Sequence, residues 1–414
     1  MTLARFTAVF ARIGLLSFGG PAAQIALMHR VLVDERGWLG EAQFLRALGF
    51  CMLLPGPEAM QLATYAGWRL RGIPGGLIAG GLFVAPGAVV ISGLAFAYAA
   101  WGAVPEVQAA FLGIKAAVVV IVVQAILRLS RRALKGPGAV ALAALAFAAL
   151  FLFDLPFPLV VLAAGLWGAA RAHGRGAGRP PLPVARTAAV LGLGGLLWAA
   201  PVGLAWAAGQ TLLTQLGLFF SKLAVVTFGG AYAVLAYMTQ EVVAQHGWLT
   251  TEQMMDALGL AETTPGPLIL VTQFVGQLTG AAAGGTPLAL AASAMVLWVT
   301  FVPCFIWIFA GAPLIDWLEH QPRIAGALAA ITAAIVGVIA NLSVWFAAHL
   351  LFAEVGRVTL GPLHLLAPDP ATLSPAALAL TGLAALLLLW LNRPLWQVLV
   401  LLAAAGGATG LIAA

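Results

Sequence analysis

Charged residues are scarce in this sequence. Only 8% of its 414 residues are Asp, Glu, Lys or Arg, against roughly 25% in a typical soluble domain. So little charge cannot cover the surface of a water-soluble fold of this length, which excludes soluble enzymes, disordered chains and nucleic-acid binders. Cysteine is equally rare. The two cysteines, Cys51 and Cys304, lie in apolar segments, with no spacing typical of a disulfide framework or a metal site.

Apolar residues make up 62% of the chain. Apolar runs of about 20 residues, long enough to cross a bilayer, recur from one end to the other. A β-barrel would instead show short alternating segments. The sequence predicts an all-α polytopic membrane protein with about 13 transmembrane helices. The expected spans are 6–28, 42–70, 74–100, 106–128, 138–153, 155–170, 187–208, 214–238, 252–282, 286–310, 324–350, 372–391 and 394–413.

The chain contains an internal repeat. Residues 10–57 align without a gap with residues 220–267, and 18 of the 48 positions are identical, clustered in FGG, GWL, ALG and PGP. After an insertion of seven residues, GIKAAVVVIVVQ (113–124) matches AITAAIVGVIAN (330–341). A cleavable leader would not recur at residue 220, so we expect the first segment to belong to the mature protein.

Three regions follow from the repeat. We expect an N-terminal transporter repeat over 1–175, a linker and an extra transmembrane helix over 176–210, and a C-terminal transporter repeat over 211–414. Duplicated membrane domains are typical of secondary transporters, whose substrate site lies between the halves.

The distribution of charge predicts the orientation of the repeats. Of the 20 Lys and Arg residues, 16 precede residue 211, whereas 6 of the 14 acids do. Basic loops such as 128–135 should be cytoplasmic. Seven expected spans separate equivalent points of the repeats, an odd number, which predicts inverted halves. If 42–70 were re-entrant, the count would be six and the halves would run parallel. Crossing is favoured because 29 helical residues exceed the bilayer core of about 30 Å.

Two duplicated motifs should break helices inside the membrane. SFGGP (17–21) and TFGGA (227–231) place adjacent glycines within a span, and PGP (55–57 and 265–267) interrupts another. A broken helix in lipid leaves backbone groups unsatisfied unless protein, water or substrate binds them. Helix N-termini that meet near the midplane would form an anion site. The alternative is that the glycines and prolines only permit close packing and kinks.

Cations within the spans favour an anionic substrate. Arg12 and Lys222 occupy equivalent positions five residues before Ser17 and Thr227. Lys115 lies in a span that is otherwise apolar, where an unpaired charge costs roughly 3 kcal/mol. We interpret it as a countercharge for the substrate. The alternative is that Lys115 reaches the interface or pairs with a buried acid.

Acids nearest the breaks are candidates for proton coupling. Glu58 follows the first PGP and Glu262 precedes the second; each could instead pair with a basic residue. A membrane-embedded enzyme, the alternative from another functional class, would need a catalytic constellation, and the motifs HExxH and GxSxG are absent. We therefore predict no enzymatic activity, no cofactor and no metal site.

Several segments resemble the chromate ion transporter family in its long form with two homologous halves. They are FGGPAAQIALMHR, GWL, FCMLLPGPEAMQLATYAGW, FGGAYAVLAYM and LAETTPGPLILVTQFVGQ, within residues 5–130 and 215–345. The resemblance implies a multi-pass inner-membrane protein of bacteria that exports chromate, a tetrahedral oxyanion, and confers chromate resistance. It also implies oppositely oriented halves. Transport of sulfate or another oxyanion remains the alternative.

Membrane potential should drive efflux. One elementary charge crossing the membrane is worth about 2.3 kcal/mol per 100 mV, so outward movement of a dianion releases roughly 4.6 kcal/mol. Proton antiport would be secondary. The expected partners are the oxyanion and the lipid bilayer, with a homodimer left open and no nucleic acid. The residues expected to bind substrate are Arg12, Ser17, Phe18, Gly19, Gly20, Pro55, Gly56, Pro57, Lys115, Lys222, Thr227, Phe228, Gly229, Gly230, Pro265, Gly266 and Pro267, with Glu58 and Glu262 as proton-coupling candidates.

Overall fold

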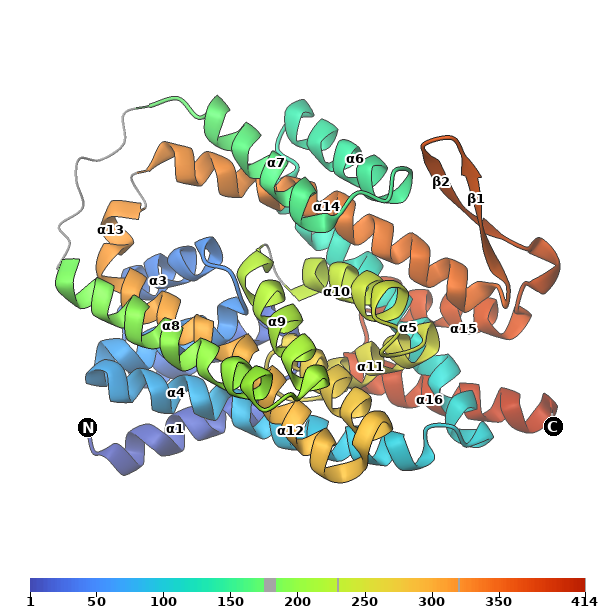
Figure 1. Cartoon of the computed structure of the whole chain (residues 1–414), viewed down its shortest axis with the longest axis horizontal. Helices are drawn as coiled ribbons and strands as arrows, with labels where there is room; N and C mark the ends of the chain where they lie inside the picture. Colours follow the sequence, from blue (N-terminus) through green and yellow to red (C-terminus); the bar gives the residue numbers. More distant parts are fainter. Residues whose placement is uncertain (175–183, 229–230, 319–320, 414) are drawn as a thin grey trace. The chain divides into compact units, whose positions relative to one another are not determined.

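A computed structural model gives the fold of the chain (Figure 1). It describes residues 1–414 except 175–183, 229–230, 319–320 and 414. The described chain is mostly helical. Within the described residues, five helices are long and apolar enough to cross a membrane, and several shorter apolar helices accompany them. The protein is therefore a multi-pass helical membrane protein.

Elements of the first half begin with short helices. They are α1 (Leu3–Leu16), α2 (Gly20–His29), the π-helical turn η1 (Arg30–Glu35), α3 (Glu41–Leu53), α4 (Glu58–Trp101), α5 (Pro105–Ala133), α6 (Pro137–Phe151), α7 (Phe157–Arg171) and α8 (Val184–Ala207). The longest of these, α4, is bent where Arg71 and Gly72 leave helical geometry.

The second half repeats this order before it diverges. Its elements are α9 (Thr211–Val226), α10 (Ala231–Thr239), π-helical η2 (Gln240–Gln245), α11 (Thr251–Thr263), 3₁₀-helical η3 (Leu268–Leu270), α12 (Val271–Gly311), η4 (Ala312–Leu314), α13 (Ile315–Leu318), α14 (Pro322–Leu351), β1 (Val355–Leu360), β2 (Leu363–Pro368), η5 (Pro370–Thr372), α15 (Pro375–Ala385), π-helical η6 (Leu386–Trp390) and α16 (Leu395–Ala413).

Backbone angles repeat between the halves. The bend of α4 at Gly72 (φ 64°, ψ −159°) has its counterpart in α12 at Gly285 (φ 68°, ψ −161°). Gly37 and Gly247 have φ of 59° and 60°. All four conformations favour glycine, because a Cβ would clash with the backbone. The extra turn η3 accounts for part of the inserted residues between the repeats.

Two expected spans are each divided into two helices. In 6–28, α1 ends at Leu16 and α2 begins at Gly20; in 42–70, α3 ends at Leu53 and α4 begins at Glu58. The 13 residues of α3 extend about 20 Å, which is shorter than the bilayer core. The helix breaks expected at SFGGP (17–21) and at both PGP motifs are found, and whether the divided span 42–70 crosses the membrane stays a prediction.

A small antiparallel hairpin corrects the expectation of an all-α chain. Strands β1 and β2 pair from Val355 with Pro368 to Leu360 with Leu363. Gly361, with φ of 63°, occupies the tight turn. Its sequence, VGRVTLGPLHLLAP, is too short and too polar to cross a membrane, and β-branched residues suit an extended backbone.

The described chain divides into two compact units. Unit 1 comprises 1–96, 173–231 and 260–325, and unit 2 comprises 97–172, 232–259 and 326–414. Each unit takes segments from both sequence repeats. In unit 1, α8 and α9 pack beside α12, as Figure 1 shows. In unit 2, α5 packs closely on α16. The backbones approach so closely at Gly113 that a Cβ there would stand 1.8 Å from the Leu402 carbonyl oxygen. Such small residues allow close helix contact in membranes.

Candidate functional site

Helix breaks of the two repeats are hydrogen-bonded to one another in unit 1. The Gly56 N–H donates to the Thr227 carbonyl oxygen at 2.8 Å, and the Gly266 N–H donates to the Ser17 carbonyl oxygen at 2.8 Å. Each PGP motif thus satisfies the carbonyl at the FGG break of the other repeat. This reciprocity explains how four interruptions can coexist in an apolar interior, where an unsatisfied backbone group costs several kcal/mol.

The first FGG motif ends one helix and begins another. Gly19 and Gly20 have φ of 83° and 79°, a conformation that glycine adopts without strain. No side chain caps the N-terminus of α2. The first amides of α2 have no partner within the helix and carry its positive partial charge. The matching glycines of the second repeat, Gly229 and Gly230, lie outside the described residues.

Hydroxyl groups at these breaks bond to their own helices. Ser17 Oγ donates to the Ile13 carbonyl at 2.6 Å, and Thr227 Oγ1 donates to the Leu223 carbonyl at 2.5 Å. Both side chains are buried. In this conformation the single proton of each hydroxyl is engaged within its own helix. Phe18 is 48% exposed and Phe228 is half-buried.

Buried glutamines hydrogen-bond to the breaks, and Gln24 links the breaks of the two repeats. Gln24 Nε2 donates to the carbonyl oxygens of Gly266 at 2.7 Å and Ser17 at 3.3 Å, and Gln61 Nε2 donates to Pro55 at 2.6 Å. The sequence interpretation did not single out either residue. A polar side chain within an apolar span was the available signal, because such residues hydrogen-bond between membrane helices.

Glycine is required in both PGP motifs. Gly56 has φ of 115°, and a Cβ there would stand 2.9 Å from Gln61 Nε2 and 3.0 Å from Cys304 Sγ. Gly266 has φ of 88°, and its nearest neighbour, Leu270 Cδ1, would be 3.2 Å away. Pro55 and Pro57 are half-buried, whereas Pro265 and Pro267 are buried. Glu58 begins α4 and Glu262 lies in the last turn of α11; both are half-buried.

The expected cations do not all lie at the breaks. Arg12 on α1 and Lys222 on α9 are exposed side chains of unit 1. Lys115 on α5 belongs to unit 2 and is 8% exposed. Its Nζ lies 3.4 Å from Oδ1 of Asp256 on α11, so the alternative of a buried acid partner is the one found. Tyr98 at the end of α4 donates its hydroxyl to Asp256 Oδ2 at 2.7 Å.

Asp256 is the functional candidate that sequence reasoning missed. Its carboxylate is fully buried, and it is the only acid between Glu252 and Glu262 on an otherwise apolar stretch. An ionisable residue within a membrane segment is a functional candidate by default. The sequence analysis chose Glu58 and Glu262 as proton-coupling candidates because they lie next to the PGP motifs in the sequence.

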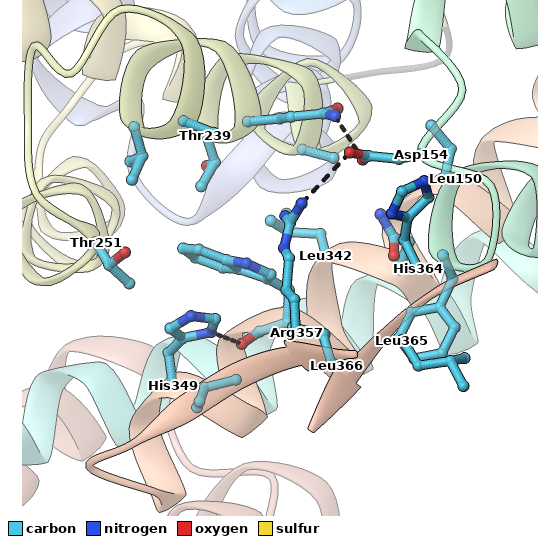
Figure 2. A pocket seen from close by; sticks show the side chains of 18 residues that line it. Leu150, Asp154, Thr239, Thr251, Leu342, His349, Arg357, His364, Leu365 and Leu366 are labelled. Atoms are coloured by element: carbon cyan, nitrogen blue, oxygen red, sulfur yellow. Dashed lines mark hydrogen bonds and ion pairs between the residues drawn. The ribbon is translucent and has the colours of Figure 1, made fainter. Parts of the chain in front are cut away.

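Unit 2 also contains an open cavity of about 300 Å³. Figure 2 shows Arg357 of β1 reaching Asp154, in the loop between α6 and α7, where the two side chains lie 3.4 Å apart. Gln240 of η2 donates to the other Asp154 oxygen at 3.0 Å. None of the expected substrate residues lines this cavity. The cavity is lined by residues of the hairpin, of η2 and of the α6–α7 loop, among others.

Within the described residues, no group of three His, Cys, Asp or Glu side chains could hold a metal ion. Cys51 and Cys304 are buried free thiols.

Duplicated helix breaks inside apolar segments define the class, a multi-pass membrane protein built from two related halves. The chain belongs to the chromate transporter family, whose model, described as "Chromate transporter", matches residues 4–169 and 214–411. It is 30% identical to the chromate transport protein of Cupriavidus metallidurans over 82% of this chain and 81% of the relative. It is 33% identical to the chromate transport protein of Pseudomonas aeruginosa over 82% and 80%. No solved structure matches the chain.

Proposed function

We propose that this protein exports chromate across the bacterial inner membrane and thereby confers chromate resistance. The observation that carries the proposal is the reciprocal pairing of helix breaks in unit 1, in a chain of the chromate transporter family. An enzyme would not require two pairs of interrupted helices. A transporter requires them, because interrupted backbone offers polar groups to a substrate inside an apolar protein.

Backbone amides at the breaks are the proposed anion donors. A dianion that enters a site of low dielectric loses hydration energy on the order of tens of kcal/mol. The uncapped N-terminus of α2, beginning at Gly20, offers amides and a positive partial charge in return. Arg12 and Lys222 of unit 1, and separately Lys115 of unit 2, are the proposed sources of positive charge. The tetrahedral shape of the substrate suits several convergent donors.

Anion flux into proteoliposomes tests the substrate. Purified protein is reconstituted, and uptake of chromate, sulfate, molybdate and phosphate is compared at equal concentrations. We expect chromate flux well above that of protein-free liposomes. A control variant, Gly19→Leu, would place a side chain at a positive φ beside Ala23 and should reduce flux strongly. Equal chromate flux in liposomes with and without the protein would refute the proposal.

Re-entrant helix pairs are the proposed arrangement of the breaks. Arg71, at the bend of α4, donates to the Met1 carbonyl and lies over the Phe6 ring. Trp38 stacks on Phe6 with ring centroids 6.4 Å apart. The start of α1, the loop after α2 and the bend of α4 therefore meet at one end of unit 1. Both α1–α2 and α3 with the first part of α4 return to the side from which they start.

With the broken helices re-entrant, the number of membrane-crossing helices between equivalent loops still predicts inverted repeats. Between the loops 29–40 and 239–250, the crossing segments are the second part of α4, then α5, α6, α7 and α8. This odd number preserves the inversion. The proposed total is nine crossing helices and four re-entrant pairs in place of thirteen crossings. Arg5, Arg71 and the basic loop 128–135 then share the cytoplasmic side, and Asp154 and Gln240 share the other.

Cysteine labelling tests this topology. Glu35 and Gln245 are exposed and occupy equivalent positions of the two loops. Each is replaced by cysteine after Cys51 and Cys304 have been changed to alanine. An impermeant maleimide added to spheroplasts should label Gln245→Cys at once and Glu35→Cys only after permeabilisation. Labelling of both from the same side would exclude inverted repeats, without bearing on the substrate.

Membrane potential is the proposed driving force. Outward movement of the dianion releases roughly 4.6 kcal/mol per 100 mV. Vesicles clamped with potassium and valinomycin at equal pH on both sides should show chromate flux that follows the imposed potential. Flux that ignores the potential and responds only to a pH gradient would rule out this energy source.

A further inference from the structure

A buried polar cluster in unit 2 joins three helices inside the apolar region. Asp256 of α11 contacts Lys115 of α5 through Oδ1 at 3.4 Å and Tyr98 of α4 through Oδ2 at 2.7 Å. Lys115 lies ten residues after the start of α5, about 15 Å along a helix, which is half the thickness of the bilayer core. The ion pair is therefore deep and almost without solvent.

The two charges come together where α11 and α5 are in close contact at Gly259 and Ile114. A Cβ at Gly259, one turn after Asp256, would stand 2.4 Å from Ile114 Cγ2 on α5. Only glycine permits this approach of α11 to α5. The close contact places the carboxylate within reach of the ammonium group.

Stability alone does not account for the pair. Replacing a buried ion pair by apolar residues of similar volume is often neutral or stabilising. The other repeat provides the comparison within this molecule: Thr332 stands at the position of Lys115 and donates to the Leu328 carbonyl of its own helix, and Arg46, at the position of Asp256, is exposed. The duplicated fold forms without the pair. Because only one copy has the pair, we infer that the pair serves the function of the protein and not its folding.

We propose that Asp256 is the proton-binding residue of the transporter and that it shares Lys115 with the substrate. In the empty state the carboxylate and the ammonium group neutralise each other. A dianion that binds the ammonium group of Lys115 removes the countercharge of Asp256. The oxygen of Asp256 that had contacted Lys115 then binds one proton from water. When the anion leaves, the ion pair forms again and the proton returns to water.

This assignment rests on the proposed function, because it takes Lys115 as a substrate contact. It differs from proton antiport through Glu58 or Glu262. Anion and proton bind to the same state, so they move in the same direction. The site then carries one net negative charge outward rather than two, and membrane potential still favours export.

The other groups around Asp256 leave it as the titrating residue. Tyr98 holds its second oxygen from α4, and Gln108 of α5, which is not titratable, also lies against it. Glu252, one turn earlier on α11, is exposed. Helices α15 and α16, which pack on α5, carry no titratable side chain within their described residues.

Titration calorimetry of full-length protein in lipid nanodiscs tests the linkage. Chromate is titrated in HEPES and in Tris, alkaline enough that chromate is fully deprotonated, and the difference in heat between buffers gives the protons bound. Wild type should take up about one proton per chromate. Asp256→Asn, which keeps an oxygen for Tyr98, should bind chromate at least as tightly and take up none. Glu252→Gln is the matched control and should behave as wild type.

Opposite results overturn the assignment. Proton uptake by Asp256→Asn equal to wild type, or no uptake by wild type that binds chromate, would refute it and leave the proposed function standing. Failure of wild type to bind any oxyanion would refute both. If Asp256→Asn does not fold, the internal pH of chromate-loaded wild-type proteoliposomes decides: efflux should make the lumen more alkaline, whereas antiport would make it more acidic.

Discussion

The two repeats share their backbone and differ in their charges. Glycines with a positive φ recur at matching positions, and the bends at Gly72 and Gly285 agree within a few degrees in both angles. The basic residues lie mainly in the first half, and the second half has more acids than bases. The shared features are those that break helices. The two copies therefore have the broken backbone in common and differ in their charges.

In the proposed topology, orientation is one property that the charges set. Opposite orientation in the membrane requires that one copy expose its loops to the cytoplasm and the other to the outside, and basic residues accumulate on the cytoplasmic side. Proton linkage, as proposed above, is the other. Lys115 and Asp256 are paired in unit 2, whereas the equivalent residues Thr332 and Arg46 form no such pair.

The largest difference between the copies should appear at this pair. Lys115→Met leaves Asp256 buried without its cation, which should destabilise the protein by roughly 3–5 kcal/mol and abolish chromate flux. The equivalent change, Thr332→Met, removes one hydrogen bond within a helix and should cost about 1 kcal/mol. Thermal unfolding and proteoliposome flux measure both effects.

A double variant separates stability from transport in this comparison. Lys115→Met with Asp256→Asn has no unpaired charge, so its stability should return most of the way to wild type while flux stays absent. Recovery of flux in the double variant would show that Lys115 serves only to neutralise Asp256.

The PGP glycines should differ in a smaller way. Gly56→Ala and Gly266→Ala both place a side chain at a positive φ, which costs about 1–3 kcal/mol. Gly56→Ala also forces Gln61 and Cys304 apart from the new Cβ, and overpacking of this kind adds about 1–3 kcal/mol. Flux should fall in both variants and more in Gly56→Ala. Equal melting temperatures for the two would contradict the contacts at Gly56.

Local backbone features could be predicted from the sequence, and contacts between distant segments could not. FGG and PGP break helices because of the residues themselves, so the divisions at Ser17 and Pro55 were predictable. Whether the divided helices cross or return depends on contacts such as Phe6 with Trp38, which bring together residues on different helices. A length argument over 42–70 contains no information about such contacts.

The ion pair illustrates the same limit. Lys115 was recognisable as a buried cation from its apolar neighbours, and a buried acid was one of its expected partners. Naming Asp256 required knowing that α11 packs against α5 through Gly259. The hairpin of β1 and β2 was missed because its residues lie between the expected spans 324–350 and 372–391, a stretch for which the sequence analysis predicted no structure.

The bends of the long helices should respond equally. Gly72→Ala and Gly285→Ala meet no atom within 4 Å of the new Cβ, so only backbone strain of about 1–3 kcal/mol remains. Because the angles agree, the two losses of thermal stability should be similar. A much larger loss at one bend would indicate that the repeats use their bends differently.

The smallest expected effect concerns a charge cluster that only the first repeat has. His29 Nε2 lies 2.6 Å from Glu41 Oε2, and Nδ1 lies 3.4 Å from Asp34 Oδ2; the equivalent of His29 in the second repeat is Thr239. The hydrogen bond with Glu41, followed by the negative charges of Glu41 and Asp34, raises the pKa of His29 above its usual 6.5. A raised folded-state pKa means that protonated His29 stabilises the fold in full below about pH 6.5. That stabilisation is lost as the pH rises through the higher folded-state value.

Because the cluster is partly exposed, the effect should stay below about 1 kcal/mol. His29→Gln should therefore lower the melting temperature slightly in acid and not at alkaline pH, whereas Thr239→Gln should show no such dependence on pH. A deficit of His29→Gln that is the same at every pH would assign His29 a packing role against Phe44 in place of an electrostatic one.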